Sequence, residues 1–257
     1  STESSNYPNT LPSPLCEYGY KAFDSTDLDY ANTPNYEWIE LNEINEAENL
    51  NLQDDTIEYK ELPFDFNYFG QTYEKGDLLT ICSNGWVSLE QTQIDYFWNF
   101  SIPSPMGPAA MIAPFMDDLD DDGKEPFEDS NGNCTYDDGE LFQDRNDNGY
   151  WDQGEQFNVY AVYDELSNKF IIQWDNVSNG EDDENCPNCV KETFQLILLD
   201  QAVHENSVNQ GGIVFVYEEI HDIDENGNFS TIGIESPDQN HGSQVIFNGM
   251  GPDIISD

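Results

Sequence analysis

Short runs of apolar, β-branched and aromatic residues recur along most of the chain, and Gly, Pro, Asn and Asp bound them. In residues 62–69 (LPFDFNYF) apolar and polar positions alternate, which is the pattern of a strand with one buried face. The runs are 36–41, 56–60, 62–69, 77–82, 85–90, 109–116, 157–164, 169–175, 193–199, 212–218, 231–235 and 244–248. This spacing predicts an all-β chain that folds as an antiparallel two-sheet β-sandwich.

The connections between these runs suggest how the chain is organised. The runs 157–164 and 169–175 are separated by four residues, 165–168 (ELSN), which predicts a β-hairpin. Helical periodicity is weak, and residues 40–51 are the best candidate for a helix. Residues 1–15 contain three prolines and few apolar side chains, so we expect an extended N-terminal arm. The sandwich domain is expected over residues 16–257, interrupted by an acidic insert at 117–155.

The charge of the chain excludes two classes of partner. Seven Lys and Arg residues stand against 53 Asp and Glu residues, for a net charge of -46. Binding to nucleic acid needs clustered basic residues, so we expect no nucleic-acid partner. A basic face for anionic lipid is absent, and no apolar run approaches 18 residues, so we expect no direct membrane insertion.

Such a charge still requires counter-ions close to the folded chain. One interpretation is a high-salt cytoplasmic protein with a solvated acidic surface, and the other is an extracellular protein that binds divalent cations. The acidic residues are clustered, and Asn, Tyr and Phe are abundant. These features favour the second interpretation, and we expect an extracellular or cell-surface location.

The acidic insert contains a twelve-residue frame of calcium-loop type at 144–155 (DRNDNGYWDQGE). Calcium loops of this length supply oxygen ligands from positions 1, 3, 5, 7, 9 and 12, with Gly at position 6 for the turn. The predicted ligands are Asp144, Asn146, Asn148, the Tyr150 carbonyl, Asp152 and Glu155, and Gly149 takes the turn position.

Two further frames precede this one. Residues 129–140 supply Asp129, Asn131, Asn133, Asp137 and Glu140, although Cys134 stands in place of the turn glycine. A partial third frame begins at Asp118 and adds Asp120 and Asp122, and Asp129 would be shared with the next frame. We therefore predict that calcium is the cofactor, with at least one ion and up to three. The alternative is a solvated acidic loop without metal. Helix–loop–helix EF-hands are not expected, because Pro126 and the short intervals leave no room for flanking helices.

The five cysteines allow several interpretations. They are Cys16, Cys82, Cys134, Cys186 and Cys189. Disulfides persist in exported proteins, and an odd number leaves one thiol unpaired or paired between chains. The CxxC segment 186–189 favours a structural disulfide or a local staple over a redox motif or half of a zinc site, because no second CxxC exists and the histidines are scattered. The pairing stays open.

Catalytic motifs are missing from the sequence. Carboxylate pairs are unavoidable in so acidic a chain and carry little information, and no GxSxG nucleophile motif occurs. Three histidines and one arginine offer few groups to assist a reaction. We therefore expect that the protein is not an enzyme.

Several segments taken together resemble a known family. They are 18–20 (YGY), 62–64 (LPF), 68–70 (YFG), 81–86 (ICSNGW), 111–119 (MIAPFMDDL), 170–174 (FIIQW), 193–198 (TFQLIL) and 231–235 (TIGIE). Over roughly residues 16–248 the chain resembles a nidogen-like β-sandwich module of secreted and surface proteins of Bacteroidota and related phyla, many of them exported by the type IX secretion system. That family usually has Trp where this chain has Met116, and a shorter connection where the acidic insert follows Asp118.

The resemblance implies a module that accompanies peptidase or adhesive domains and is not itself catalytic. We therefore expect a non-catalytic, extracellular, calcium-stabilised structural or adhesive surface protein, either free-standing or part of a larger protein, with a filament-forming subunit as one form. Its expected partners are further copies of itself, other surface proteins, or glycans. The alternative function is an accessory or carbohydrate-binding module of a secreted enzyme such as a peptidase. Aromatic residues that would stack on sugars are Tyr96, Phe97, Trp98, Tyr150 and Trp151.

Overall fold

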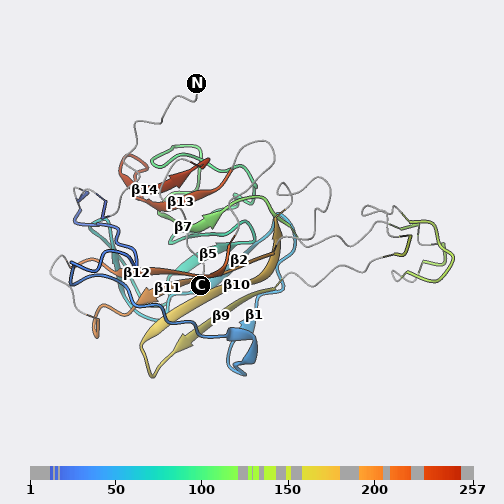
Figure 1. Ribbon diagram of the computed structural model, residues 1–257, viewed down its shortest axis with the longest axis horizontal. Helices are drawn as coiled ribbons and strands as arrows, with labels where there is room; N and C mark the ends of the chain where they lie inside the picture. Colours follow the sequence, from blue (N-terminus) through green and yellow to red (C-terminus); the bar gives the residue numbers. More distant parts are fainter. Residues whose placement is uncertain are drawn as a thin grey trace.

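The structure is all-β and consists of two large antiparallel sheets that face each other (Figure 1). It is a computed structural model. It describes residues 12–13, 15–16, 18–120, 127–128, 130–132, 136–142, 149–151, 158–179, 191–204, 209–220 and 229–249. The predicted fold class is therefore confirmed, and the calcium-binding character of the insert stays a prediction.

The first sheet has the strand order β1, β9, β10, β11, β12, and β8 also pairs with β10. Its strands are β1 (Glu48–Asn49), β8 (Leu119–Asp120), β9 (Asn158–Asp164), β10 (Lys169–Asn179), β11 (Lys191–Leu199) and β12 (Gly212–Glu219). The second sheet has the order β14, β13, β7, β6, β5, β2. Its strands are β2 (Ile57–Glu61), β5 (Leu78–Cys82), β6 (Trp86–Ser88), β7 (Met111–Met116), β13 (Thr231–Glu235) and β14 (Gly242–Phe247). A separate hairpin joins β3 (Phe66–Tyr68) and β4 (Gln71–Tyr73).

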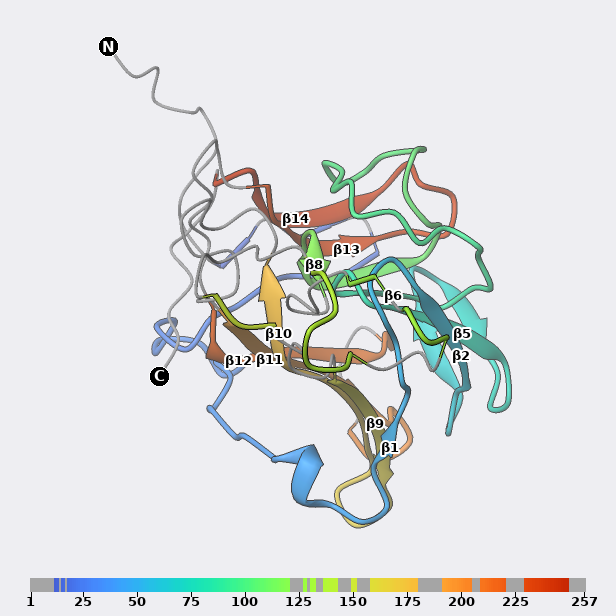
Figure 2. The same cartoon turned by 90° about the vertical axis from the view of Figure 1, so that its right-hand side faces the viewer.

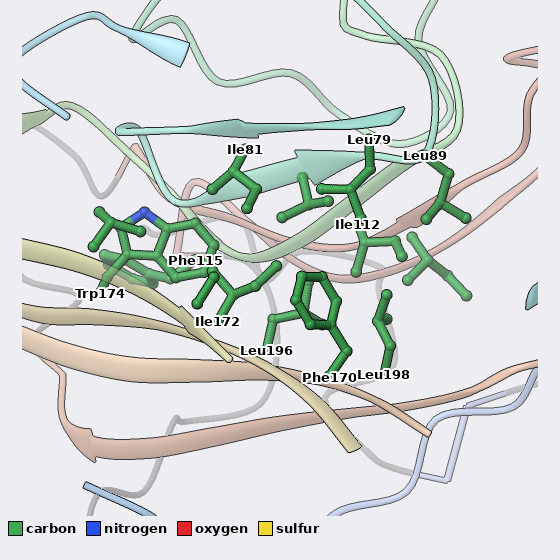
Figure 3. Packing of buried hydrophobic residues seen from close by; sticks show 14 of the residues in the cluster. Leu79, Ile81, Leu89, Ile112, Phe115, Phe170, Ile172, Trp174, Leu196 and Leu198 are labelled. Carbon is green, nitrogen blue, oxygen red and sulfur yellow. The ribbon is translucent and has the colours of Figure 1, made fainter. Parts of the chain in front are cut away.

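Side chains from the two sheets interdigitate in the main core (Figure 3). Phe170, Ile172 and Trp174 on β10 point from the first sheet towards Ile81 and Ile112 of the second sheet. The indole of Trp174 stacks on Phe194, with ring centroids 5.0 Å apart. Its Nε1 donates hydrogen bonds to the carbonyls of Cys82 (3.0 Å) and Ser83 (3.1 Å). A buried indole N–H needs such a partner, so this contact ties the first sheet to the end of β5 in the second.

The outer face of the first sheet is covered by the segment before β1, and this explains one wrong prediction. Residues 36–41 were expected to form a strand, but residues 36–40 have no regular structure, and Leu41–Glu43 form the 3₁₀ turn η1. Leu41 packs on Ile171 and neighbouring apolar side chains of the outer face. Its N–H donates to Gln173 Oε1 (3.0 Å), so a side chain, not a neighbouring strand, accepts the backbone hydrogen bond. The helix considered for residues 40–51 is likewise reduced to η1, followed by β1.

The predicted β9–β10 hairpin is confirmed, with Lys169 opposite Asp164. Asn168 adopts a positive φ of 55° at its turn, which asparagine tolerates better than most residues. Three short strands were not predicted, β1, β4 and β8, because two or three residues are too few to show an alternating pattern.

Strands β8 and β9 occupy consecutive positions along the same side of β10. Asp120 of β8 lies opposite Ser178, and Asn158 of β9 lies opposite Asp175. Both strands run antiparallel to β10, and β11 pairs with the other side of β10 over the same residues. Residues 121–157 therefore leave and rejoin one strand position, with their ends about three strand residues or ~10 Å apart. The acidic segment is thus an insertion within a strand.

Candidate metal-binding insert

The described parts of the insert lie to one side of the two sheets (yellow-green in Figure 1, facing the viewer in Figure 2). An isolated antiparallel bridge joins Phe127 to Phe142, and the N–H of Glu128 donates to the carbonyl of Leu141 (2.8 Å). These contacts close the segment 128–141 at its base. The bridge brings Glu128 and Leu141, the described residues that flank the 129–140 frame, close to each other.

Four aromatic side chains, Phe127, Tyr136, Phe142 and Trp151, pack together at this base, and we refer to them as the aromatic cluster. Tyr136 and Trp151 are stacked, with ring centroids 4.5 Å apart and planes at 15°. Phe127 and Phe142 each meet Tyr136 edge-on, at 5.8 Å and 5.7 Å. Tyr136 is position 8 of the 129–140 frame, and Trp151 is position 8 of the 144–155 frame. The equivalent aromatic residues of the two frames therefore pack against each other.

Three predicted ligands of the 129–140 frame are brought together by hydrogen bonds. Asn131 Nδ2 donates to Asp137 Oδ2 (2.5 Å), and the N–H of Asp137 donates to Glu140 Oε2 (3.0 Å). Glu140 Oε1 accepts hydrogen bonds from both the N–H and the hydroxyl of Ser130 (2.8 Å each). Positions 3, 9 and 12 of this frame thus gather around one turn. Ser130 was not predicted, because hydroxyl side chains are too common in loops for its position to be informative.

The turn glycines take the backbone conformation that such loops need. Gly149, at position 6 of the 144–155 frame, has a φ of 80°, in the left-handed region that favours glycine. In the 129–140 frame, where Cys134 occupies position 6, Gly132 and Gly139 adopt φ values of 75° and 100°. Tyr150 occupies position 7, where such loops supply a backbone carbonyl, and its side chain is 76% exposed.

The third frame begins at the edge of the first sheet. Leu119 and Asp120 form β8, so this stretch is extended and paired with Ser178 and Asn179. Asp117, just before it, is buried and accepts hydrogen bonds from the N–H of Asp118 (2.9 Å) and from Asn179 Nδ2 (3.0 Å). The structure therefore places Asp118 and Asp120 where the chain enters the insert.

The remaining predicted ligands lie outside the described residues. They are Asp122, Asp129, Asn133, Asp144, Asn146, Asn148, Asp152 and Glu155. Within the part of the chain that the structure describes, no group of three or more His, Cys, Asp or Glu side chains is arranged to hold a metal ion. Asp137 and Glu140 are the two carboxylates of the 129–140 frame that can be placed, together with the amide of Asn131.

The cysteines that the structure describes are not in disulfides. Cys16 and Cys82 are free thiols, and burial raises the pKa of the Cys82 thiol to about 12, so it stays protonated at neutral pH. Cys134 and the CxxC segment 186–189 lie outside the described residues, so their disulfide prediction remains open.

Some of the aromatic residues considered for sugar stacking are on the surface. Tyr96, Phe97 and Trp98 are exposed by 51%, 36% and 64%, and Phe97 stacks on Trp98 at 4.9 Å. Trp151 belongs to the aromatic cluster, so its stacking on Tyr136 already occupies one of its faces. Trp98 and Trp151 thus each have one ring face occupied by a neighbouring aromatic side chain, and sugar stacking stays a prediction for both.

A buried carboxyl lies on β13 and contacts the segment between β6 and β7. Glu235, on β13, is fully buried, and its Oε1 accepts a hydrogen bond from the N–H of Ser104. Its Oε2 makes no hydrogen bond within the described part of the chain. Burial raises the pKa of Glu235 to about 7, although the hydrogen bond from Ser104 opposes this shift.

This shift predicts a pH-dependent stability. Between about pH 4.5 and 7 the folded protein holds a proton on Glu235 that the unfolded chain releases, so this contribution to stability falls as the pH rises through that window. The total is at most ~3 kcal/mol. Glu235→Gln keeps an oxygen for Ser104 and removes the charge, so its unfolding free energy relative to the original protein should rise from pH 4.5 to 7. Urea unfolding from pH 4.5 to 7 measures this difference in unfolding free energy, and Glu61→Gln at an exposed position is the control. A difference that is constant with pH would show that Glu235 does not titrate there.

The fold and the insert define an all-β, two-sheet domain in which an acidic insertion carries the candidate site. A family model described as NIDO related matches residues 29–137, and this match supports a nidogen-like domain, as the sequence resemblance predicted. The matched family is a non-enzymatic domain type, and a nidogen-like domain suggests an extracellular one. No curated protein and no solved structure matches the chain. None of the described segments forms a helix long and apolar enough to cross a membrane.

Proposed function

We propose that this protein is a non-catalytic, extracellular structural or adhesive protein whose acidic insert binds calcium and becomes rigid on binding. The observation that carries the proposal is the stacking of Tyr136 on Trp151, at equivalent positions of two frames with calcium-loop spacing. In a solvated acidic loop without metal, nothing would require the aromatic residues of the two frames to pack against each other. The proposal extends to the cell surface and to self-association or filaments, as in the surface proteins that the sequence resembles.

The chemistry of the donors fits a hard divalent cation. Asn131, Asp137 and Glu140 offer only oxygen to a metal ion, and the frames contribute further carboxylate, amide and carbonyl oxygens. Calcium accepts six to eight oxygen ligands in flexible geometry, whereas magnesium requires a near-ideal octahedron and retains several waters. Loops that supply so many protein oxygens therefore suit calcium better.

The proposal predicts that calcium binding depends on the frame and not simply on charge. Asp137→Asn removes a carboxylate at position 9, and we expect it to weaken calcium binding to this loop at least tenfold. Asp138→Asn removes the same charge one residue later, at a position that supplies no ligand, and should change the affinity less than threefold. Isothermal titration with calcium chloride, after removal of bound metal by chelator, compares the two variants. Equal losses would mean that only net charge attracts the ion.

Limited proteolysis gives a separate test of the rigid state. In excess chelator the carboxylates repel each other, so cleavage should concentrate between residues 121 and 147. With calcium the same bonds should become resistant. The same cleavage pattern with calcium and with chelator, together with no heat of calcium binding, would contradict the proposal.

A further inference from the structure

A groove of about 450 Å³ lies where the segments flanking the β3–β4 hairpin meet the ends of strands of the first sheet. Phe64 and Asp65 precede β3, Lys75 follows β4, and Tyr163 is near the end of β9. Asp200 and Gln201 follow β11. The volume of the groove is in the range of small-ligand sites. None of these residues belongs to the insert, so the groove is independent of the proposed calcium site.

Hydrogen bonds from backbone N–H groups hold the polar side chains of the groove in place. Asp65 Oδ1 accepts a hydrogen bond from the N–H of Lys75 (2.8 Å), and Asp200 Oδ1 accepts one from the N–H of Ala202 (2.9 Å). Gln201 Oε1 accepts from the N–H of Asn67 (2.9 Å). Within the described residues, the other oxygen of each carboxylate and the Gln201 Nε2 make no hydrogen bond. Each side chain is thus fixed by one atom and retains a second polar atom that a ligand can contact, which lowers the entropy cost of binding.

One wall of the groove is aromatic. Tyr163 is half-buried and packs against the buried Phe64, with ring centroids 5.7 Å apart. Its hydroxyl donates to Asn168 Oδ1 (3.4 Å), which fixes the ring. An aromatic ring beside fixed hydrogen-bonding groups can bind a ligand that has an apolar C–H face and a rim of hydroxyls.

The charges of the groove select among ligand classes. The net charge of -46 repels an anionic ligand, whereas in the groove itself the ammonium of Lys75 offsets one of the two carboxylates and weakens the attraction for a cationic ligand. Hydroxyl groups can donate to the carboxylates and accept from Lys75 and Gln201. We propose that this groove binds a neutral saccharide, with Tyr163 against a sugar ring and Asp65 and Asp200 as hydroxyl acceptors.

The test uses the whole chain and an array of neutral gluco-, galacto- and manno-oligosaccharides, with saturation-transfer NMR on the strongest binder. Asp65→Asn and Asp200→Asn keep the oxygen that accepts the backbone hydrogen bond and replace the other carboxylate oxygen with an amide nitrogen. Each should weaken binding at least tenfold. Asp77 is the matched control, because its Oδ2 accepts from the N–H of Glu74 (2.8 Å) in the same hairpin region, outside the groove. Asp77→Asn should change the affinity less than twofold.

Three outcomes would overturn the assignment. They are no neutral saccharide bound, binding that survives the double variant Asp65→Asn/Asp200→Asn, and stronger binding of sialylated or sulfated glycans or of lysine-rich peptides. Urea unfolding of each variant verifies that it is folded. Saccharide binding should be the same with calcium and with chelator, so the result does not depend on the calcium proposal.

Discussion

Gly85→Ala is expected to destabilise the folded protein by more than ~3 kcal/mol and to leave little folded material at 37 °C. Gly85 joins β5 to β6 with a φ of 72°. A Cβ atom added there would lie 1.7 Å from the carbonyl oxygen of Phe115 and 2.8 Å from its carbonyl carbon. Both atoms belong to the backbone of β7, so no side-chain rotation relieves the clash. The strands β6 and β7, which pair in the second sheet, would have to separate.

Gly76→Ala is the matched control for this substitution. Gly76 has a φ of 94°, and no atom of the described residues lies within 4 Å of its added Cβ. Alanine therefore introduces only backbone strain, which costs about 1–2 kcal/mol. Urea unfolding of both variants, followed by tryptophan fluorescence, separates strain from clash. Equal losses of stability would mean that the close approach of Gly85 to Phe115 does not hold the sheet together.

The recurrence of short apolar, β-branched and aromatic runs between turn residues was sufficient to predict the long strands and the fold class. It identified β10 and β11, whose inward side chains Ile172 and Leu196 meet the second sheet. It failed at residues 36–41, where the apolar side chains Trp38 and Leu41 face the outer side of the first sheet. Periodicity shows that a residue is buried but not which surface buries it, so an irregular covering segment resembled a strand.

Spacing placed Asn131, Asp137 and Glu140 in one frame, and hydrogen bonds join these residues in the structure, while their role as calcium ligands stays a prediction. It did not predict the aromatic cluster, since the bridge that joins Phe127 to Phe142 leaves no mark in the spacing of the ligand residues. The groove was not predicted either. Its polar residues come from segments more than a hundred residues apart, and each is an ordinary loop residue until the fold assembles them.

Deleting residues 121–157 should abolish calcium binding and leave the sandwich folded. Because β8 and β9 are consecutive along β10, a two-residue linker opposite Asn176 and Val177 would make them one continuous strand. The deletion removes twelve acidic residues against Lys124 and Arg145. Closing a shorter loop costs less entropy, so the variant should gain about 2 kcal/mol of stability. Calcium titration and thermal unfolding measure both effects.

The same deletion tests how a peripheral insert affects the stability of the sandwich. Without calcium, repulsion among the carboxylates expands the insert, while its ends must stay ~10 Å apart on β10, so chelation should lower the unfolding temperature of the original protein. The deletion variant should unfold at one temperature with calcium or chelator. A Gly/Ser loop of equal length separates the effect of charge from that of length, and in chelator it should be more stable than the original insert. Calcium bound by the deletion variant would place the site elsewhere, and failure of that variant to fold would show that the insert contributes to the core.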